Sequence, residues 1–205
     1  MKNRLLSLLC LLPLWVSSPA WALFDAQVFT GSRTTDFKTT GSAAESLKGS
    51  ELKAAFHIDP IPLVPVGFGL SLAQTNWDDA SKLGYGIYHF KNVQGTDVNL
   101  EIQAWLPIPG FGLVPYGKLG YTLAGAYTAT FDTTGDPTLA LSPSGSFIAL
   151  GLRYEFLMRF GVIAEYEKAS RKLGFDKIKD LPDTSTKLSL DANSSSFLFG
   201  IQAGI

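Results

Sequence analysis

Hydrophobic and polar residues alternate along much of this chain with a period of two, the period of a β-strand whose two faces meet different surroundings. In 97–105, for example, Val98 and Ile102 fall on one face, while Asp97 and Glu101 fall on the other. The alternating segments are 23–31, 51–58, 66–73, 97–105, 115–123, 147–156, 160–167 and 196–205. The pattern therefore predicts an all-β chain of eight strands.

The connections between these segments alternate between short apolar turns and longer polar stretches. Two of the short turns contain the proline-rich sequences "DPIPLVPVGFG" and "LPIPGFGLVPYG", and proline suits turns because it cannot donate a ladder hydrogen bond. The stretches rich in Ser, Thr, Asp, Gly and Lys are 32–50, 76–95, 128–145 and 168–193. Short turns on one side and long loops on the other are typical of an antiparallel up-and-down barrel, with both termini on the side of the short turns.

The two faces of the segments differ in charge. One face of every segment is free of charged residues, whereas the other collects acidic and basic side chains. A transmembrane barrel turns its apolar face to lipid, and side chains fill the lumen when the wall has eight strands. We therefore predict an eight-stranded antiparallel up-and-down transmembrane β-barrel with a charge cluster in its lumen: Glu51, Lys53, Glu101, Lys118, Arg153, Glu155, Glu165 and Glu167.

This charge cluster has two interpretations. Buried charges need partners, because an unpaired buried charge costs several kcal/mol, so the cluster can be a structural salt-bridge core. In the other interpretation it forms a gated ionic plug or a narrow polar path through the barrel. Together with Asp25 and Asp97 the charged face holds seven acids and three bases, so we expect either raised carboxylate pKa values or water and cations trapped among these groups.

The long polar stretches are where a barrel of this kind carries its specificity. The aromatic segment 83–90 either extends two strands beyond the membrane or shapes an opening for apolar molecules. The last stretch contains five basic residues, which we interpret either as a loop that contacts lipopolysaccharide phosphates or as a solvated loop. These residues are Lys168, Arg171, Lys172, Lys177 and Lys179.

Aromatic side chains gather near both sets of connections, as expected for two girdles at the membrane interfaces. On the side of the short turns these are Trp105, Phe111, Phe156 and Phe160. On the side of the long loops they are Trp77, Tyr127 and Phe147. For any single one of these residues, packing in the protein core is the alternative to a place in a girdle.

The N-terminus has the pattern of a cleaved export signal. Lys2 and Arg4 precede an apolar stretch at 5–16, and Ala20 and Ala22 follow in the small-x-small arrangement after which signal peptidase cuts. The apolar stretch is too short to span a bilayer, which takes roughly 20 residues. We predict that residues 1–22 are removed and that residues 23–205 form the barrel.

Charge and cysteine content limit the function further. The single cysteine, Cys10, lies inside the predicted signal, and Leu9 before it does not fit a lipidation site. The exported chain would then contain no disulfide. Without Lys2 and Arg4, 15 basic residues face 18 acidic ones, a net charge of −3, which excludes a nucleic-acid-binding surface.

These features together resemble the small outer-membrane β-barrel proteins of Gram-negative bacteria, the class of the OmpA transmembrane domain, OmpX and OmpW. The resemblance implies a monomer located in the outer membrane, with lipid, lipopolysaccharide and the barrel assembly machinery as partners. Members of this class usually end in an aromatic residue, whereas this chain ends in Ile205. The implied role is structural or surface interaction. The alternatives are an OmpW-like narrow channel for small or hydrophobic solutes and a soluble periplasmic lipocalin-like barrel, which would need the apolar face inside.

Enzymatic chemistry finds little support in the residues. A deacylase would need a serine nucleophile beside a histidine, and the two histidines, His57 and His89, have no serine nearby in the sequence. Two distant histidines make no metal site once the only cysteine is removed with the signal. We expect no catalytic residue, no metal and no cofactor.

Overall fold

The computed structural model describes residues 24–39, 44–59, 64–78, 80–85, 88–106, 108, 112–132, 138–157, 160–175 and 188–204. These residues form strands and one short 3₁₀ turn, η1 (Ala80–Lys82). The strands are β1 (Phe24–Thr39), β2 (Glu45–Ile58), β3 (Val66–Trp77), β4 (Gly84–Tyr85), β5 (Tyr88–Trp105), β6 (Leu113–Phe131), β7 (Thr138–Leu157), β8 (Phe160–Phe175) and β9 (Leu188–Gly204). Residues 1–23, which contain the predicted signal, and Ile205 lie outside the described part.

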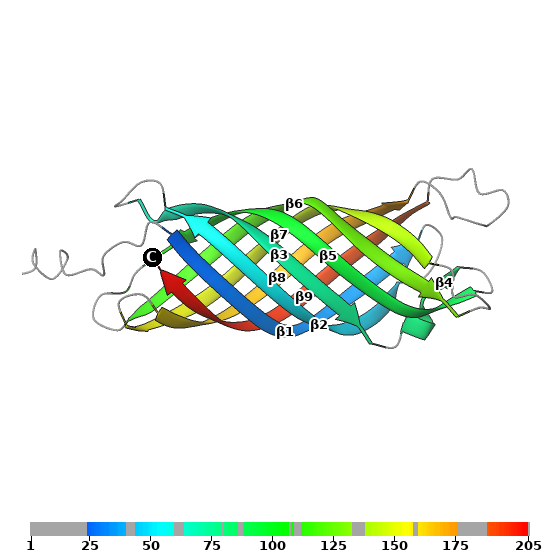
Figure 1. The fold of residues 1–205 in the computed structure, drawn as a ribbon, viewed down its shortest axis with the longest axis horizontal. Helices are drawn as coiled ribbons and strands as arrows, with labels where there is room; N and C mark the ends of the chain where they lie inside the picture. Colours follow the sequence, from blue (N-terminus) through cyan, green and yellow to red (C-terminus); the bar gives the residue numbers. More distant parts are fainter. Residues whose placement is uncertain are drawn as a thin grey trace, which may run out of the picture.

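The long strands form one closed antiparallel barrel (Figure 1). Their order around the wall is β3-β2-β1-β9-β8-β7-β6-β5, and β3 pairs with β5 to close it. The two-residue β4 only pairs with the start of β5, so the wall has eight strands and the predicted fold is confirmed. The start of β1 lies beside the end of β9, where Asp25 is opposite Gly204. We call this end of the barrel the terminal end and the other the loop end.

The strands are longer than the sequence pattern predicts. β1 continues to Thr39 and β2 already begins at Glu45, so most of 32–50 is wall and not loop. The other predicted loops, 76–95, 128–145 and 168–193, also lose residues to strands at both of their ends. In 83–90, β4 pairs with β5, so this segment extends the wall beyond β3.

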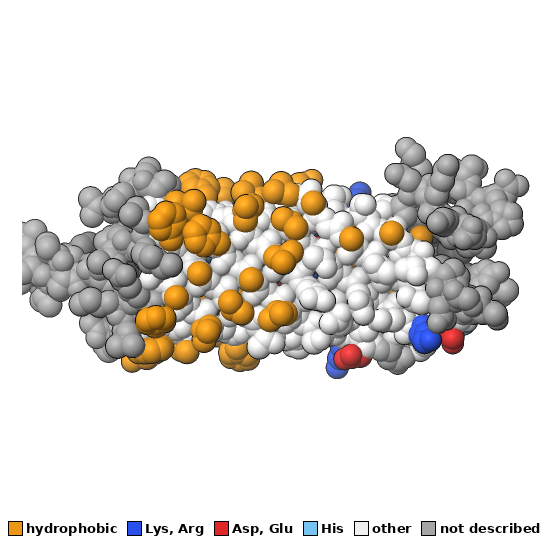
Figure 2. Space-filling model, viewed as in Figure 1, with side chains coloured by type: hydrophobic (Ala, Val, Ile, Leu, Met, Phe, Trp, Pro, Cys, Tyr) orange, Lys and Arg blue, Asp and Glu red, His pale blue; other side chains and the backbone are white. Residues whose placement is uncertain are grey.

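Large apolar side chains face outward around the terminal half of the barrel, which Figure 2 shows as a concentration of orange in that half. We call this surface the apolar belt. Its exposed residues include Val28, Leu52, Phe56, Phe68, Leu70, Leu72, Leu100, Ile102, Leu119, Tyr121, Ile148, Leu150, Leu152, Tyr154, Phe160, Val162, Tyr166, Phe197, Phe199 and Ile201. Because the charged face of the same strands points inward, the orientation that a soluble lipocalin-like barrel needs is excluded for this half.

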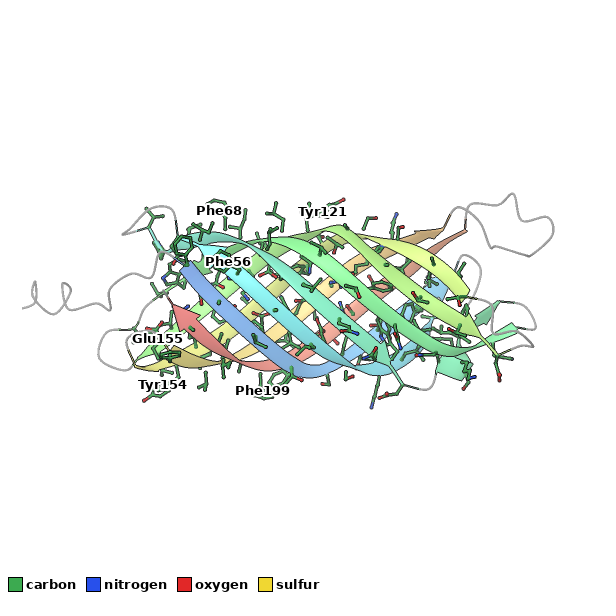
Figure 3. All side chains as sticks on the ribbon, viewed as in Figure 1. Phe56, Phe68, Tyr121, Tyr154, Glu155 and Phe199 are labelled. Carbon is green, nitrogen blue, oxygen red and sulfur yellow. The ribbon has the colours of Figure 1, made fainter. Side chains whose placement is uncertain are left out.

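Aromatic side chains lie at both borders of the apolar belt. Phe56, Phe68 and Tyr154 lie near the terminal end, and Tyr121 and Phe199 lie near the middle of the barrel (Figure 3). The outer border is therefore half-way along the barrel and not at the loop end.

Three aromatic residues that the sequence assigned to the outer girdle point into the barrel instead. Trp77, Tyr127 and Phe147 are all buried, at 2–4% exposure. Trp77 and Tyr127 belong to a cluster of buried apolar side chains toward the loop end, and the ring of Phe147 lies in the lumen against Lys53 Nζ. For these three residues the core-packing alternative holds and the girdle alternative does not.

Polarity is reversed in the loop half of the barrel. Its outward side chains are mostly polar, such as Thr34 and Asp36 on β1, whereas Phe37 on the same strand points inward. The inward side chains form what we call the loop-end core: Phe37, Leu47, Trp77, Ala80, Leu83, Val93, Tyr127, Ala129, Leu139, Leu141, Leu173 and Ala192. This half is thus built like a water-soluble barrel, with an apolar interior and a polar exterior.

No helix in the part of the chain described above is long and apolar enough to cross a membrane.

Candidate functional site

Two lysines and two glutamates form the centre of the charged lumen. Lys53 Nζ lies 3.1 Å from Glu101 Oε1 and 3.2 Å from Glu165 Oε1. Lys118 Nζ lies 2.8 Å from Glu165 Oε2 and donates a hydrogen bond of 2.8 Å to Gln27 Oε1. These side chains come from β1, β2, β5, β6 and β8, so they join strands that are not neighbours in the wall.

Two arginines form a second layer toward the loop end. Arg33 Nη1 lies 3.6 Å from Glu51 Oε1 and 3.7 Å from Asp97 Oδ2. Arg171 Nη2 lies 3.2 Å from the same Asp97 oxygen and 3.7 Å from Glu167 Oε1. Glu167 also connects the two layers, because its Oε2 accepts a hydrogen bond of 2.9 Å from Lys53 Nζ in the centre.

A third group lies at the terminal end, where Figure 3 shows Glu155. Arg153 Nε lies 2.9 Å from Glu155 Oε1, and Arg153 Nη1 lies 3.4 Å from Asp25 Oδ2. Asp59 lies just beyond β2, where partial burial and the charge of Asp25 raise its pKa to about 6. This mouth therefore has more carboxylates than cations.

Charged and aromatic side chains together fill the lumen of the terminal half. The side chains of the central lysines, Glu101 and Glu165 are at most 1% exposed. The rings of Phe29 and Phe147 pack on the ammonium groups: Lys118 Nζ is 4.8 Å from the centre of Phe29, and Lys53 Nζ is 4.7 Å from that of Phe147. Cation–π contacts of this kind stabilise a desolvated cation. Above this level the loop-end core fills the interior.

The eight residues predicted for the charge cluster all occupy the lumen, but the structure adds two cations that the sequence analysis missed. Arg33 and Arg171 lie in segments that were interpreted as loops. With them, five bases in the lumen face the seven acids, and the predicted excess of acid falls from four to two. The signal that could have found Arg33 is its place on the charged face, in phase with Asp25 and Gln27.

Solved structures of known proteins share this architecture. Neisserial surface protein A (NspA) aligns with a TM-score of 0.61 at 10% identity, over 89% of this chain and 97% of that one. The outer membrane protein AlkL aligns with a TM-score of 0.50 at 13% identity, over 92% and 93% of the two chains.

The chain has the fold of the small outer-membrane β-barrels. The outer membrane protease OmpT from Escherichia coli aligns less well with this barrel, with a TM-score of 0.48 at 10% identity over 89% and 96% of the two chains. No protein-family model and no curated protein sequence matches the chain. At these identities the likeness describes the fold of the barrel and not its role.

Within the outer-membrane barrel fold, the five basic residues predicted to contact lipopolysaccharide separate. Arg171 points into the lumen, 2% exposed, so its assignment to a surface loop is wrong. Arg171 lies on β8, where side chains point alternately into the lumen and outward. Glu167 and Ala169, which share its face of the strand, also point into the lumen. Lys168 and Lys172 lie on the outer face of β8 and are exposed. Lys177 and Lys179 lie outside the described residues.

The two histidines lie in different parts of the barrel. His57 is buried in the lumen, with Nε2 3.0 Å from Glu101 Oε2. His89 is exposed at the start of β5, with Nδ1 3.0 Å from the backbone oxygen of Ser81. The two rings therefore do not meet.

Proposed function

We propose that this protein is an integral outer-membrane barrel with a closed lumen, which acts through its loop end in a structural or surface-interaction role and not as an enzyme. The apolar belt supports the membrane location, because exposed large hydrophobic side chains around a whole barrel are stable only in lipid. The terminal end would face the periplasm, and the loop end would face the outside. An exported precursor with a removable signal, residues 1–22, is part of this proposal.

The buried ion pairs that bridge the lumen are the observation that carries the proposal. Along the barrel axis, a solute would meet the ion pairs of the charged lumen and then the loop-end core. The charges of the centre connect non-adjacent strands, so a path can open only if several buried ion pairs separate. Removing one partner of such a pair costs about 3–5 kcal/mol, which favours a permanent core over a gate.

Electrical conductance across a planar lipid bilayer tests the closed lumen directly. We expect no current steps above the background from the purified chain, while a general porin in the same bilayer gives clear steps. Reproducible steps that depend on this chain would contradict the proposal. They would support the alternative of a narrow channel for small or hydrophobic solutes.

The membrane location needs a separate experiment in cells. The purified outer-membrane fraction is run on a denaturing gel with and without boiling, because a small barrel that stays folded in detergent migrates differently until it is heated. We expect the protein in this fraction, with a heat-dependent shift. A soluble periplasmic protein without a shift would contradict the membrane location.

A further inference from the structure

A groove of about 770 Å³ crosses the outer wall of the barrel at the border of the apolar belt that faces the loop end. It follows one row of residues in direct register across five strands: Thr34 on β1, Ser195 on β9, Lys168 on β8, Ile148 on β7 and Leu119 on β6. Because strands in a barrel are tilted, such a row climbs obliquely along the wall. The groove therefore leads from the belt into the polar half.

The two ends of the groove differ in chemistry. Leu119, Ile148 and Tyr166 line the belt side, and all three are exposed. On the other side the lining consists of small polar side chains, such as Ser170 and Asn193. Small residues leave the sheet itself as the floor of the groove. A molecule that fits must be apolar at one end and rich in hydrogen-bonding groups at the other, which is the chemistry of a lipid with a polar head.

Lys168 is the cation of the groove. Its side chain is exposed, and its cross-strand neighbours, Ser195 and Ile148, are uncharged. No ion pair joins Lys168 to another side chain in the described ranges. An unpaired ammonium at the border between lipid and water is a donor for a phosphate group.

Asp36 also lines the groove, and its negative charge limits how many phosphate groups a ligand in the groove can carry. It lies two strands and two residues from Lys168, which corresponds to about 12 Å between the backbones. A carboxylate repels a second phosphate but accepts hydrogen bonds from hydroxyl groups, as does the Asn193 side chain beside it. The lining therefore combines one phosphate donor with acceptors for sugar hydroxyls.

We propose that this groove binds the head of a phosphorylated glycolipid of the outer leaflet, with its phosphate on Lys168 and its sugar hydroxyls on Asp36 and Asn193. The first acyl chain would lie along Leu119 and Ile148 on the belt. The proposal rests on the proposed membrane location. It differs from the predicted basic loop, because the site is on the wall and uses one lysine.

Native mass spectrometry of the full chain released from detergent micelles tests the site. The probes are monophosphorylated hexa-acylated lipid A, the same lipid after phosphatase treatment, and phosphatidylglycerol. The variant is Lys168→Gln, and the matched control is Lys172→Gln, which removes the same charge from the same face of β8 but outside the groove lining. Ser170→Tyr fills the groove without changing a charge.

We expect the dissociation constant for lipid A to rise about fivefold in Lys168→Gln and in Ser170→Tyr, and to stay within about twofold in Lys172→Gln. Removing the phosphate should weaken binding to the unaltered chain and have no further effect on Lys168→Gln. Equal loss in both lysine variants would overturn the site, as would equal binding of phosphatidylglycerol. Displacement of lipid A by millimolar inorganic phosphate would show a free-phosphate site and also overturn it. Cell fractionation, which does not depend on Lys168, reports separately on the proposed location.

Discussion

Replacing Lys53 with methionine would remove a cation that three carboxylates share. Its Nζ lies 3.1 Å from Glu101, 3.2 Å from Glu165 and 2.9 Å from Glu167, and its side chain is 1% exposed. Removing one partner of a buried pair costs about 3–5 kcal/mol, because the remaining charge keeps its desolvation penalty. Lys118 still neutralises part of Glu165 at 2.8 Å. We therefore expect a loss near the lower end of this range, about 3 kcal/mol.

Urea unfolding of the chain in lipid vesicles, followed by tryptophan fluorescence, measures this loss. With a slope on the order of 2 kcal/mol per molar urea, the midpoint should fall by about 1.5 M. Lys48→Met on the outer face of the same strand is the control, and its midpoint should change by less than about 0.3 M because exposed substitutions cost little. Adding Glu167→Gln to Lys53→Met should restore part of the stability. Equal midpoints for the two lysine variants would refute the reasoning.

Three further changes probe other parts of the barrel. Asp59, with its pKa raised to about 6, holds its proton more tightly in the folded chain, so stability falls as pH rises from about 4 to 6. At pH 8, Asp59→Asn should raise the urea midpoint by an amount that corresponds to on the order of 1 kcal/mol, a small value because the site is half-exposed. At pH 4 the midpoint should not change, and a difference that is the same at both pH values would contradict this prediction. Trp77→Ala removes the ring that packs on Phe37, where the ring centroids are 5.5 Å apart. This should lower the free energy of unfolding by about 3–5 kcal/mol, so the gel shift should occur at a lower temperature. An unchanged shift temperature would show that the loop-end core contributes little to stability. Gly120→Val places a side chain against the ring of Phe147 and should reduce the folded fraction on unheated gels, while adding Phe147→Ala should restore it.

The terminal half of the barrel could be predicted from the sequence because lipid on one side and a crowded polar lumen on the other produce strict alternation. The loop half could not, since both of its surroundings change while the strands continue. Arg33 and Arg171 follow the inward positions of their strands, yet they were assigned to loops because the outward residues had become polar. On β6, Leu123 is an extra residue relative to β5, so inward positions shift from Thr122 to Tyr127. Such a bulge reverses the parity of a strand and has no signature in composition.

The groove shows a different limit of sequence analysis. Its lining comes from residues that are far apart in the chain, such as Thr34 and Lys168, and that become neighbours only through the register of β1, β9 and β8. The individual serines and threonines have no special spacing along their own strands. Only the lysine stood out in the sequence, and there it was grouped with Arg171, which faces the other way.

The reversed polarity of the loop half determines how far this protein would stand above the lipid. On β7 the belt spans Ile148 to Phe156, and the strand continues on the loop side as far back as Thr138. At about 3.4 Å per residue and a tilt of about 40°, that part of the wall rises on the order of 25 Å above the belt. In an outer membrane the loop-side ends of the strands would then lie among the saccharides of lipopolysaccharide, outside the hydrocarbon layer. An antibody, a phage or another cell could reach them without approaching the bilayer.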